Sequence, residues 1–200
     1  MKRAVLVQLR GGLGNQMFQY ANARALCIRN GAELVLDNWS GFVRDSLYRR
    51  HYELDSFPIS ARMATSLERL PFWFDRIRAR FVSSDSNVAE RHWYGDSLRE
   101  TKFQFLSEIA EYSVRGRAWI TGSWQSPAYF EKYRREIQRE LMPPKPTQAR
   151  FVELGEKMRT QRSVALGVRL YEEAANPAVH SADCKLKSVE EVNAAVEELS

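Results

Sequence analysis

The sequence has few cysteines and few histidines. Two cysteines, Cys27 and Cys184, and three histidines occur among its 200 residues. The cysteines match no metal-ligand spacing, the histidines are widely separated, and no Asp-x-Asp pair is present, so the common zinc motifs are excluded. We therefore expect two unpaired thiols and no metal site.

Long apolar runs and low-complexity segments are also lacking. A membrane-spanning helix needs about 20 apolar residues. The longest apolar runs here are far shorter, for example the four residues 4–7. Gln8 and Arg10 interrupt the first apolar stretch too early for a signal peptide. With ten glycines and seven prolines, the composition is that of a globular protein. We expect a cytoplasmic protein of one domain or slightly more.

The charge is basic and is carried by arginine. The formal net charge is +5, with 23 arginines and seven lysines. Arginine suits phosphate and carboxylate ligands, so a phosphorylated substrate or a membrane surface is compatible with this composition, as is a merely solvated surface. The arginines are scattered and form no nucleic-acid-binding motif, so nucleic acid is not an expected partner.

The first 37 residues predict a βαβ unit. A β-branched stretch at residues 4–9 is typical of a buried strand, and a glycine turn follows it. The pattern indicates a helix over residues 15–30, ended by Gly31, and a second strand over residues 33–37. Such a unit requires a parallel sheet, and the fold class is therefore α/β.

The middle of the chain is less regular. Residues 38–113 show poor periodicity, and we expect helices and irregular segments there. Residues 118–121 predict a strand. Ser126 and Pro127 then suit the cap and the first position of a helix whose apolar face would hold Phe130, Tyr133, Ile137 and Leu141.

Three prolines between residues 143 and 146 mark a candidate domain boundary. Beyond them, residues 148–159 predict a helix, residues 163–168 a buried strand, and residues from Ser188 onward a further helix. The apolar side chains of the first of these helices are expected to face inward: Phe151, Leu154 and Met158.

The glycine turn at residues 11–14 is the strongest local chemical feature. Such a turn lets backbone N–H groups at a helix N-terminus approach an anion, although a tight turn without a ligand would need the same glycines. The dinucleotide fingerprint would require a third glycine where Met17 stands. Asp37 ends the second strand, where a ribose-binding acid would lie, so a dinucleotide-binding protein stays open as an alternative.

Four stretches carry a more specific signal. They are GGLGNQMFQYA at residues 11–21, LVLD at 34–37, YELDSF at 52–57 and GSWQSPAYF at 122–130. Together they resemble the family 11 glycosyltransferases, the α-1,2-fucosyltransferases of bacteria and animals. The resemblance implies a two-lobed Rossmann-like fold of the GT-B type. Residues 1–145 would form the N-terminal, acceptor-side lobe, and residues 147–200 would begin a nucleotide-binding lobe that is only partly present.

The resemblance also implies a reaction. L-fucose would move from GDP-fucose to the 2-hydroxyl of a galactoside, with inversion and without metal or other cofactor. The partners would be a nucleotide sugar and a glycan acceptor, and the protein would associate peripherally with the inner membrane face. A non-catalytic or truncated remnant of such an enzyme is the alternative, because the family's His-x-Arg-Arg-Gly-Asp-Tyr pattern is largely lost between Gly167 and Glu173.

Site residues follow from the same resemblance. Arg169, the one arginine of that pattern that is kept, would face the diphosphate. Glu172 and its neighbour Glu173 are candidates for the base by their position alone, and a solvated acidic pair is the alternative. Asn15 could cap the helix, bind a substrate, or do both, and for Trp124 core packing is as good an interpretation as binding. The residues expected to bind donor or acceptor are Gly11, Gly12, Gly14, Asn15, Gln16, Trp124 and Gln125.

Overall fold

A computed structural model describes residues 2–46, 48–71, 89–92, 94–100 and 104–163, together with the helical positions 190, 193, 194 and 197. The chain divides into two compact units. The first comprises Met1–Asp45 and Arg49–Pro144, and the second comprises Ser46–Tyr48 and Lys145–Ser200. The fold of the first unit positions the candidate site.

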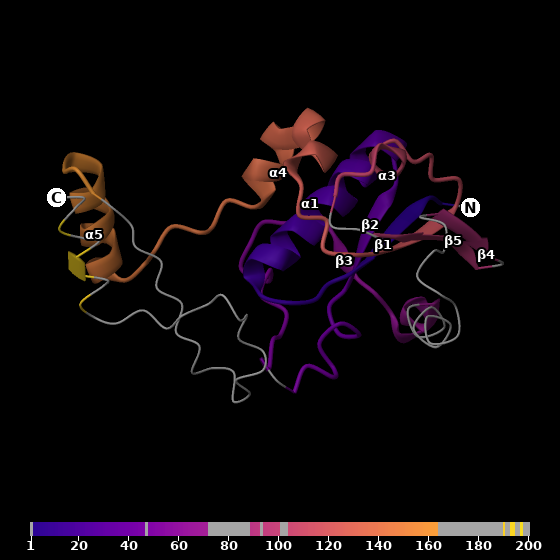
Figure 1. Ribbon diagram of the computed structural model, residues 1–200, viewed down its shortest axis with the longest axis horizontal. Helices are drawn as coiled ribbons and strands as arrows, with labels where there is room; N and C mark the ends of the chain where they lie inside the picture. The colour runs from indigo at the N-terminus through magenta and orange to yellow at the C-terminus, as the bar shows by residue number, and fades with distance from the viewer. Residues whose placement is uncertain are drawn as a thin grey trace. The chain divides into compact units, whose positions relative to one another are not determined.

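The first unit is built on a six-stranded mixed sheet (Figure 1). Its strand order is β3-β2-β1-β6-β5-β4. The neighbours from β3 to β5 pair in parallel, and β4 pairs antiparallel with β5. The strands are β1 (Ala4–Gln8), β2 (Glu33–Asp37), β3 (Arg62–Met63), β4 (Ala89–His92), β5 (Gly95–Arg99) and β6 (Arg117–Thr121). This confirms the α/β class and is consistent with a Rossmann-like fold, while the two-lobed arrangement stays a prediction.

The predicted βαβ unit is confirmed. Helix α1 (Leu13–Asn30) links β1 to β2 and begins two residues earlier than expected. It ends at Gly31, whose left-handed backbone (φ 57°, ψ 40°) places its N–H against the carbonyls of Cys27 and Ile28. A glycine adopts this conformation without the steric cost that a Cβ would add.

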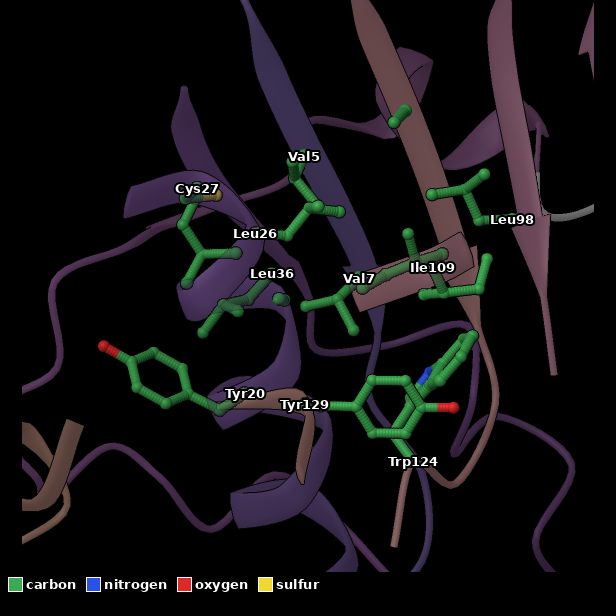
Figure 2. Packing of buried hydrophobic residues seen from close by; sticks show 14 of the residues in the cluster. Val5, Val7, Tyr20, Leu26, Cys27, Leu36, Leu98, Ile109, Trp124 and Tyr129 are labelled. Atoms are coloured by element: carbon green, nitrogen blue, oxygen red, sulfur yellow. The ribbon is translucent and has the colours of Figure 1, made fainter. Parts of the chain in front are cut away.

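Alternating side chains give the sheet two buried faces. Val7, Leu36 and Ile120 contribute to one face, which α1 and α3 (Ser107–Ala110) cover through residues such as Leu26 and Ile109 (Figure 2). The opposite face contains Leu6, Val35 and Trp119.

A helical segment at residues 66–71 packs over this second face. There the indole Nε1 of Trp119 donates to the carbonyl of Glu68 at 3.0 Å. Helices therefore cover both faces of the sheet, as in doubly wound α/β folds.

Cys27 lies in the core, with 1% of its surface exposed, and forms no disulfide. Burial raises the pKa of its thiol to about 12, which makes the thiolate scarce at neutral pH. The expectation of an unpaired thiol is confirmed for Cys27, whereas Cys184 lies outside the described residues. No helix in the described part of the chain is both long and apolar enough to cross a membrane.

The sequence analysis missed the strands β3, β4 and β5. Their sequences, RM, AERH and GDSLR, have no apolar alternation. Backbone pairing with neighbouring strands defines them instead, and only β5 is buried over most of its length. An expectation of helices and irregular segments was therefore wrong for these residues.

The single helix expected after Pro127 is divided. Two 3₁₀ turns, η1 (Pro127–Tyr129) and η2 (Glu131–Tyr133), precede α4 (Arg134–Glu140). The capping role of Ser126 is confirmed, because its hydroxyl oxygen accepts from the N–H of Ala128 at 3.4 Å. The two interruptions lie at Phe130 and Tyr133, whose φ angles of −128° and −116° are not helical.

Helix α4 packs against α1 through a small-residue contact and an ion pair. Ile137 lies against Ala21 and Ala25, whose small side chains let the two helices approach. Next to this contact, Arg24 donates to both carboxylate oxygens of Glu140 at 2.7–3.0 Å. The hydroxyl of Tyr20 donates to the same carboxylate at 2.6 Å.

Helix α5 (Ala149–Thr160) of the second unit confirms the helix predicted after the prolines. Its apolar side chains do not face inward as expected, because Phe151, Leu154 and Met158 are 44%, 51% and 48% exposed. The buried strand predicted at residues 163–168 falls mainly outside the described residues, as does the helix start at Ser188.

The segment at residues 66–71 begins with a capping box. The carboxylate of Glu68 accepts from the backbone N–H of Thr65 at 3.0 Å. It also accepts from the guanidinium of Arg62 at 2.7 and 2.8 Å. The Arg62 hydrogen bonds, and then those from Thr65, lower the pKa of Glu68 to about 2.

This depressed pKa predicts an acid-dependent stability. Because Glu68 loses its proton more readily in the folded state, its contribution is complete above the usual pKa of 4.5 and is lost as pH falls towards about 2. Urea unfolding across this range should show a steeper loss of stability in the wild type than in Glu68→Gln. Glu153→Gln, at a 70% exposed side chain, should match the wild type. A Glu68→Gln curve parallel to the wild type would contradict the assignment.

Candidate functional site

The candidate site lies where β1 and β6 end. These parallel neighbours are followed by the glycine turn at residues 11–14 and by the loop at residues 122–126, respectively. From β1 the chain proceeds to β2 and β3 on one side, and returns through β5 and β6 on the other. Open α/β sheets bind ligands at the carboxyl ends of strands at such a switch in strand order.

A hydrogen bond joins these two loops. The Nε2 of Gln125 donates to Oδ1 of Asn15 at 2.5 Å, across 110 positions of sequence. Two residues predicted from separate motifs are therefore in direct contact. Asn15 does not cap α1, because the cap position is Gly12 and no side chain bonds there.

The glycine turn needs glycine at its first position. Gly11 has φ +75°, and a Cβ there would lie 2.5 Å from Nδ2 of Asn15. Gly12 precedes the first turn of α1, which carries no acidic residue. At Gly14, no atom of the described residues lies within 4 Å of the position that a Cβ would take. The first turn of α1 is therefore open at this glycine.

Arg50 adds a positive charge that the sequence analysis did not single out. Its guanidinium Nη1 lies 3.6 Å from the position of a Cβ on Gly12, and its backbone N–H donates to Asp45 at 3.2 Å. A guanidinium beside a helix N-terminus has the donors and the charge that a phosphate group requires. Arg50 was missed because it stands in an irregular stretch with several other arginines.

The side chain of Gln16 is buried and connects parts of the protein chain to one another. It is fully buried, and its Nε2 donates to the carbonyls of Gly11 at 2.9 Å and His51 at 2.8 Å. Its Oε1 accepts from the N–H of Glu53 at 2.9 Å. We expected Gln16 to bind a substrate, but its amide instead ties the glycine turn to the segment that carries Arg50.

Trp124 is also buried, in contrast to the expectation that it lines a sugar pocket. Its side chain has no exposed surface and packs edge-on against Tyr129 with ring centroids 5.5 Å apart (Figure 2). The core-packing alternative is therefore the observed one. Its backbone is left-handed (φ 56°), a conformation that costs a non-glycine residue about 1 kcal/mol or more.

Glu100 holds this strained loop from the end of β5. Its carboxylate accepts from the N–H of Ser123 at 2.5 Å and of Trp124 at 3.2 Å. A pocket of about 300 Å³ opens beside it, lined by Glu100, Gln104, Phe105, Gln125, Ser126 and Tyr129. Of these six residues, Gln125 alone was predicted to bind a substrate. Glu100 was missed because the strand that leads to it, β5, was not recognised in the sequence.

Asp37 is not available to a ribose. It is fully buried, and its Oδ1 accepts from the N–H groups of Trp39 and Ser40 at 3.1 and 3.0 Å. The same oxygen lies 3.4 Å from the Nε of Arg69. Asp37 does end β2, as predicted, but its buried carboxylate does not fit the ribose-binding role on which the dinucleotide alternative depended.

The two residues expected to take part in catalysis, Arg169 and Glu172, lie outside the described residues, and their roles stay predictions. Within the described part of the chain, no group of three or more His, Cys, Asp or Glu side chains is arranged to hold a metal ion.

Comparison with known proteins gives one informative relative. The chain is 27% identical over 167 residues to an α-1,2-colitosyltransferase of Escherichia coli, a match that covers 82% of this chain and 53% of the relative. The chain thus spans about half the length of this curated relative and is a distant homologue of a glycosyltransferase. No protein-family model matches the chain. No solved structure matches significantly.

Replacing the buried amide of Gln16 should lower the stability of the protein more than replacing the exposed amide of Gln125. Gln16→Leu would leave the carbonyls of Gly11 and His51 and the N–H of Glu53 without this partner. We expect a loss of about 2–4 kcal/mol in the free energy of unfolding, measured in urea. Gln125→Leu, at an exposed side chain, should cost less than about 1 kcal/mol. Equal losses would contradict the structural role of Gln16.

Proposed function

We propose that this chain takes part in sugar transfer from a GDP-activated deoxyhexose to a hydroxyl of a glycan acceptor. The observation that carries the proposal is the Asn15–Gln125 hydrogen bond. It brings the two longest stretches of the glycosyltransferase resemblance together at the switch point of the sheet. The curated relative supports the same reaction class.

The donor is proposed to be GDP-fucose or GDP-colitose. Fucose follows from the resemblance of the four motifs, and colitose from the name of the relative. The linkage named there, α-1,2, agrees with the 2-hydroxyl of a galactoside that the motifs imply. Transfer is proposed to proceed with inversion and without a metal ion.

In this reaction the acceptor hydroxyl attacks the anomeric carbon while the bond from that carbon to the diphosphate breaks. The proton of the hydroxyl passes to a base, for which Glu172 is proposed. The leaving diphosphate gains negative charge, which N–H donors and arginine stabilise. Arg169 is proposed for this role, and Arg50 with the first turn of α1 offers the same chemistry among the described residues.

The proposal is tested by measuring GDP release. The chain is incubated with GDP-fucose or GDP-colitose and a β-galactoside, with and without EDTA. We expect acceptor-dependent GDP release with one of the donors and the same rate in EDTA. Absence of release with both donors at high enzyme concentration would favour the non-catalytic alternative, and loss of activity in EDTA would contradict metal independence.

A double-mutant cycle then tests whether the Asn15–Gln125 hydrogen bond contributes to catalysis. Asn15→Ala and Gln125→Ala should each lower kcat/KM about tenfold or more, and the double variant should fall little further, because each single change already removes the shared hydrogen bond. Independent, multiplying effects would show that the pair does not act together.

Arg50 gives a separate prediction about the donor. Arg50→Ala should raise the KM for the nucleotide sugar about tenfold, which corresponds to ~1.4 kcal/mol, and leave the acceptor KM unchanged. Arg135→Ala, on the exposed side of α4, is the matched control and should have no effect. An unchanged donor KM in Arg50→Ala would exclude Arg50 from phosphate binding.

A further inference from the structure

We propose that the 300 Å³ pocket at the ends of β5 and β6 binds a neutral pyranoside, and that it is the subsite for the acceptor sugar. The inference rests on the proposed function. It assigns roles in acceptor binding to Glu100, Gln104 and Phe105, which none of the sequence motifs contains. The pocket opens between the loops that follow these strands.

The pocket has a fixed aromatic wall. Phe105 is 41% exposed, and the centroid of its ring lies 5.0 Å from that of Tyr129. Tyr129 is itself held, since its hydroxyl accepts from the N–H of Leu106 at 3.0 Å and donates to the carbonyl of Gln104 at 3.2 Å. Behind it lies the buried ring of Trp124 (Figure 2). Phe105 therefore presents a supported apolar face to the C–H groups of a sugar ring at little entropic cost.

Polar groups stand beside this wall. The carboxylate of Glu100 is oriented by the N–H groups of Ser123 and Trp124, and a carboxylate has about four lone-pair sites for hydrogen bonds. The hydroxyl of Ser126 accepts from Ala128, which leaves its hydrogen for donation. With the amide of Gln125, the pocket offers both acceptors and donors, as the hydroxyl groups of a sugar require.

The charge of the pocket favours a neutral ligand over a phosphate. Among the described residues that line it, Glu100 is the one charged group, and it is negative. A diphosphate would be repelled there and attracted to Arg50 at the glycine turn. Gln125 belongs to both regions, because it lines the pocket and donates to Asn15 in the first turn of α1. A sugar in the pocket would thus lie next to the proposed donor side.

The test is a binding experiment with the 200-residue chain. Methyl β-galactoside and GDP are titrated separately, and binding is followed by saturation-transfer NMR and by the side-chain amide signal of Gln125. We expect the galactoside to bind and to shift this signal. Phe105→Ala and the more conservative Phe105→Leu should weaken its binding about tenfold, equivalent to ~1.4 kcal/mol. Phe151→Ala, at a similarly exposed phenylalanine, should bind as the wild type does.

Several outcomes overturn the proposal. They are absence of galactoside binding, binding that both Phe105 variants leave unchanged, and a shift of the Gln125 signal by GDP with no shift by the sugar. The GDP-release assay separates this failure from that of the proposed function. Transfer with an unchanged acceptor KM in Phe105→Leu would refute the pocket alone, whereas galactoside binding without GDP release would refute transfer alone.

Discussion

The backbone pairing of β1 on both of its edges is the constraint on which the rest of the structure depends. Leu6 is in register with Val35 of β2 and with Trp119 of β6. β1 therefore lies between β2 and β6, and the strand order reverses between β1 and β6. Because α1 follows β1 directly, its N-terminus is placed at the switch point. The loop after β6 arrives at the same edge, and the site follows from this topology.

Around this centre, one buried amide and two partly buried carboxylates hold two loops and a helix in place. Gln16 ties the glycine turn to residues 51–53, Glu100 ties the loop at residues 122–126 to β5, and Glu140 ties α4 to α1. Each is a side-chain contact between segments distant in sequence. Withdrawing a polar group from water is costly unless its partners are present, so these contacts favour one arrangement of the segments that they join.

The βαβ unit and β6 could be predicted because their apolar residues are continuous and their ends are marked by glycine. The short strands β4 and β5 could not, since AERH and GDSLR are polar and are defined by their partners. The same limit applied to the site. Asn15 and Gln125 stand in recognisable motifs, whereas Glu100 and Phe105 become neighbours of Gln125 only through tertiary pairing. The burial of Gln16 and Trp124 likewise depends on contacts that no local pattern reveals.

The left-handed backbone of Trp124 has a consequence for where substitutions can change the pocket. Its loop is held at once by the buried indole, by Glu100 and by Tyr129, so most substitutions within it would disturb several contacts together. Gln104 and Phe105, which contact Tyr129 from the loop after β5, are exposed instead of buried. A substitution at either of these exposed side chains would therefore change the surface of the pocket more readily than one in the loop, which acts as a fixed frame for that surface.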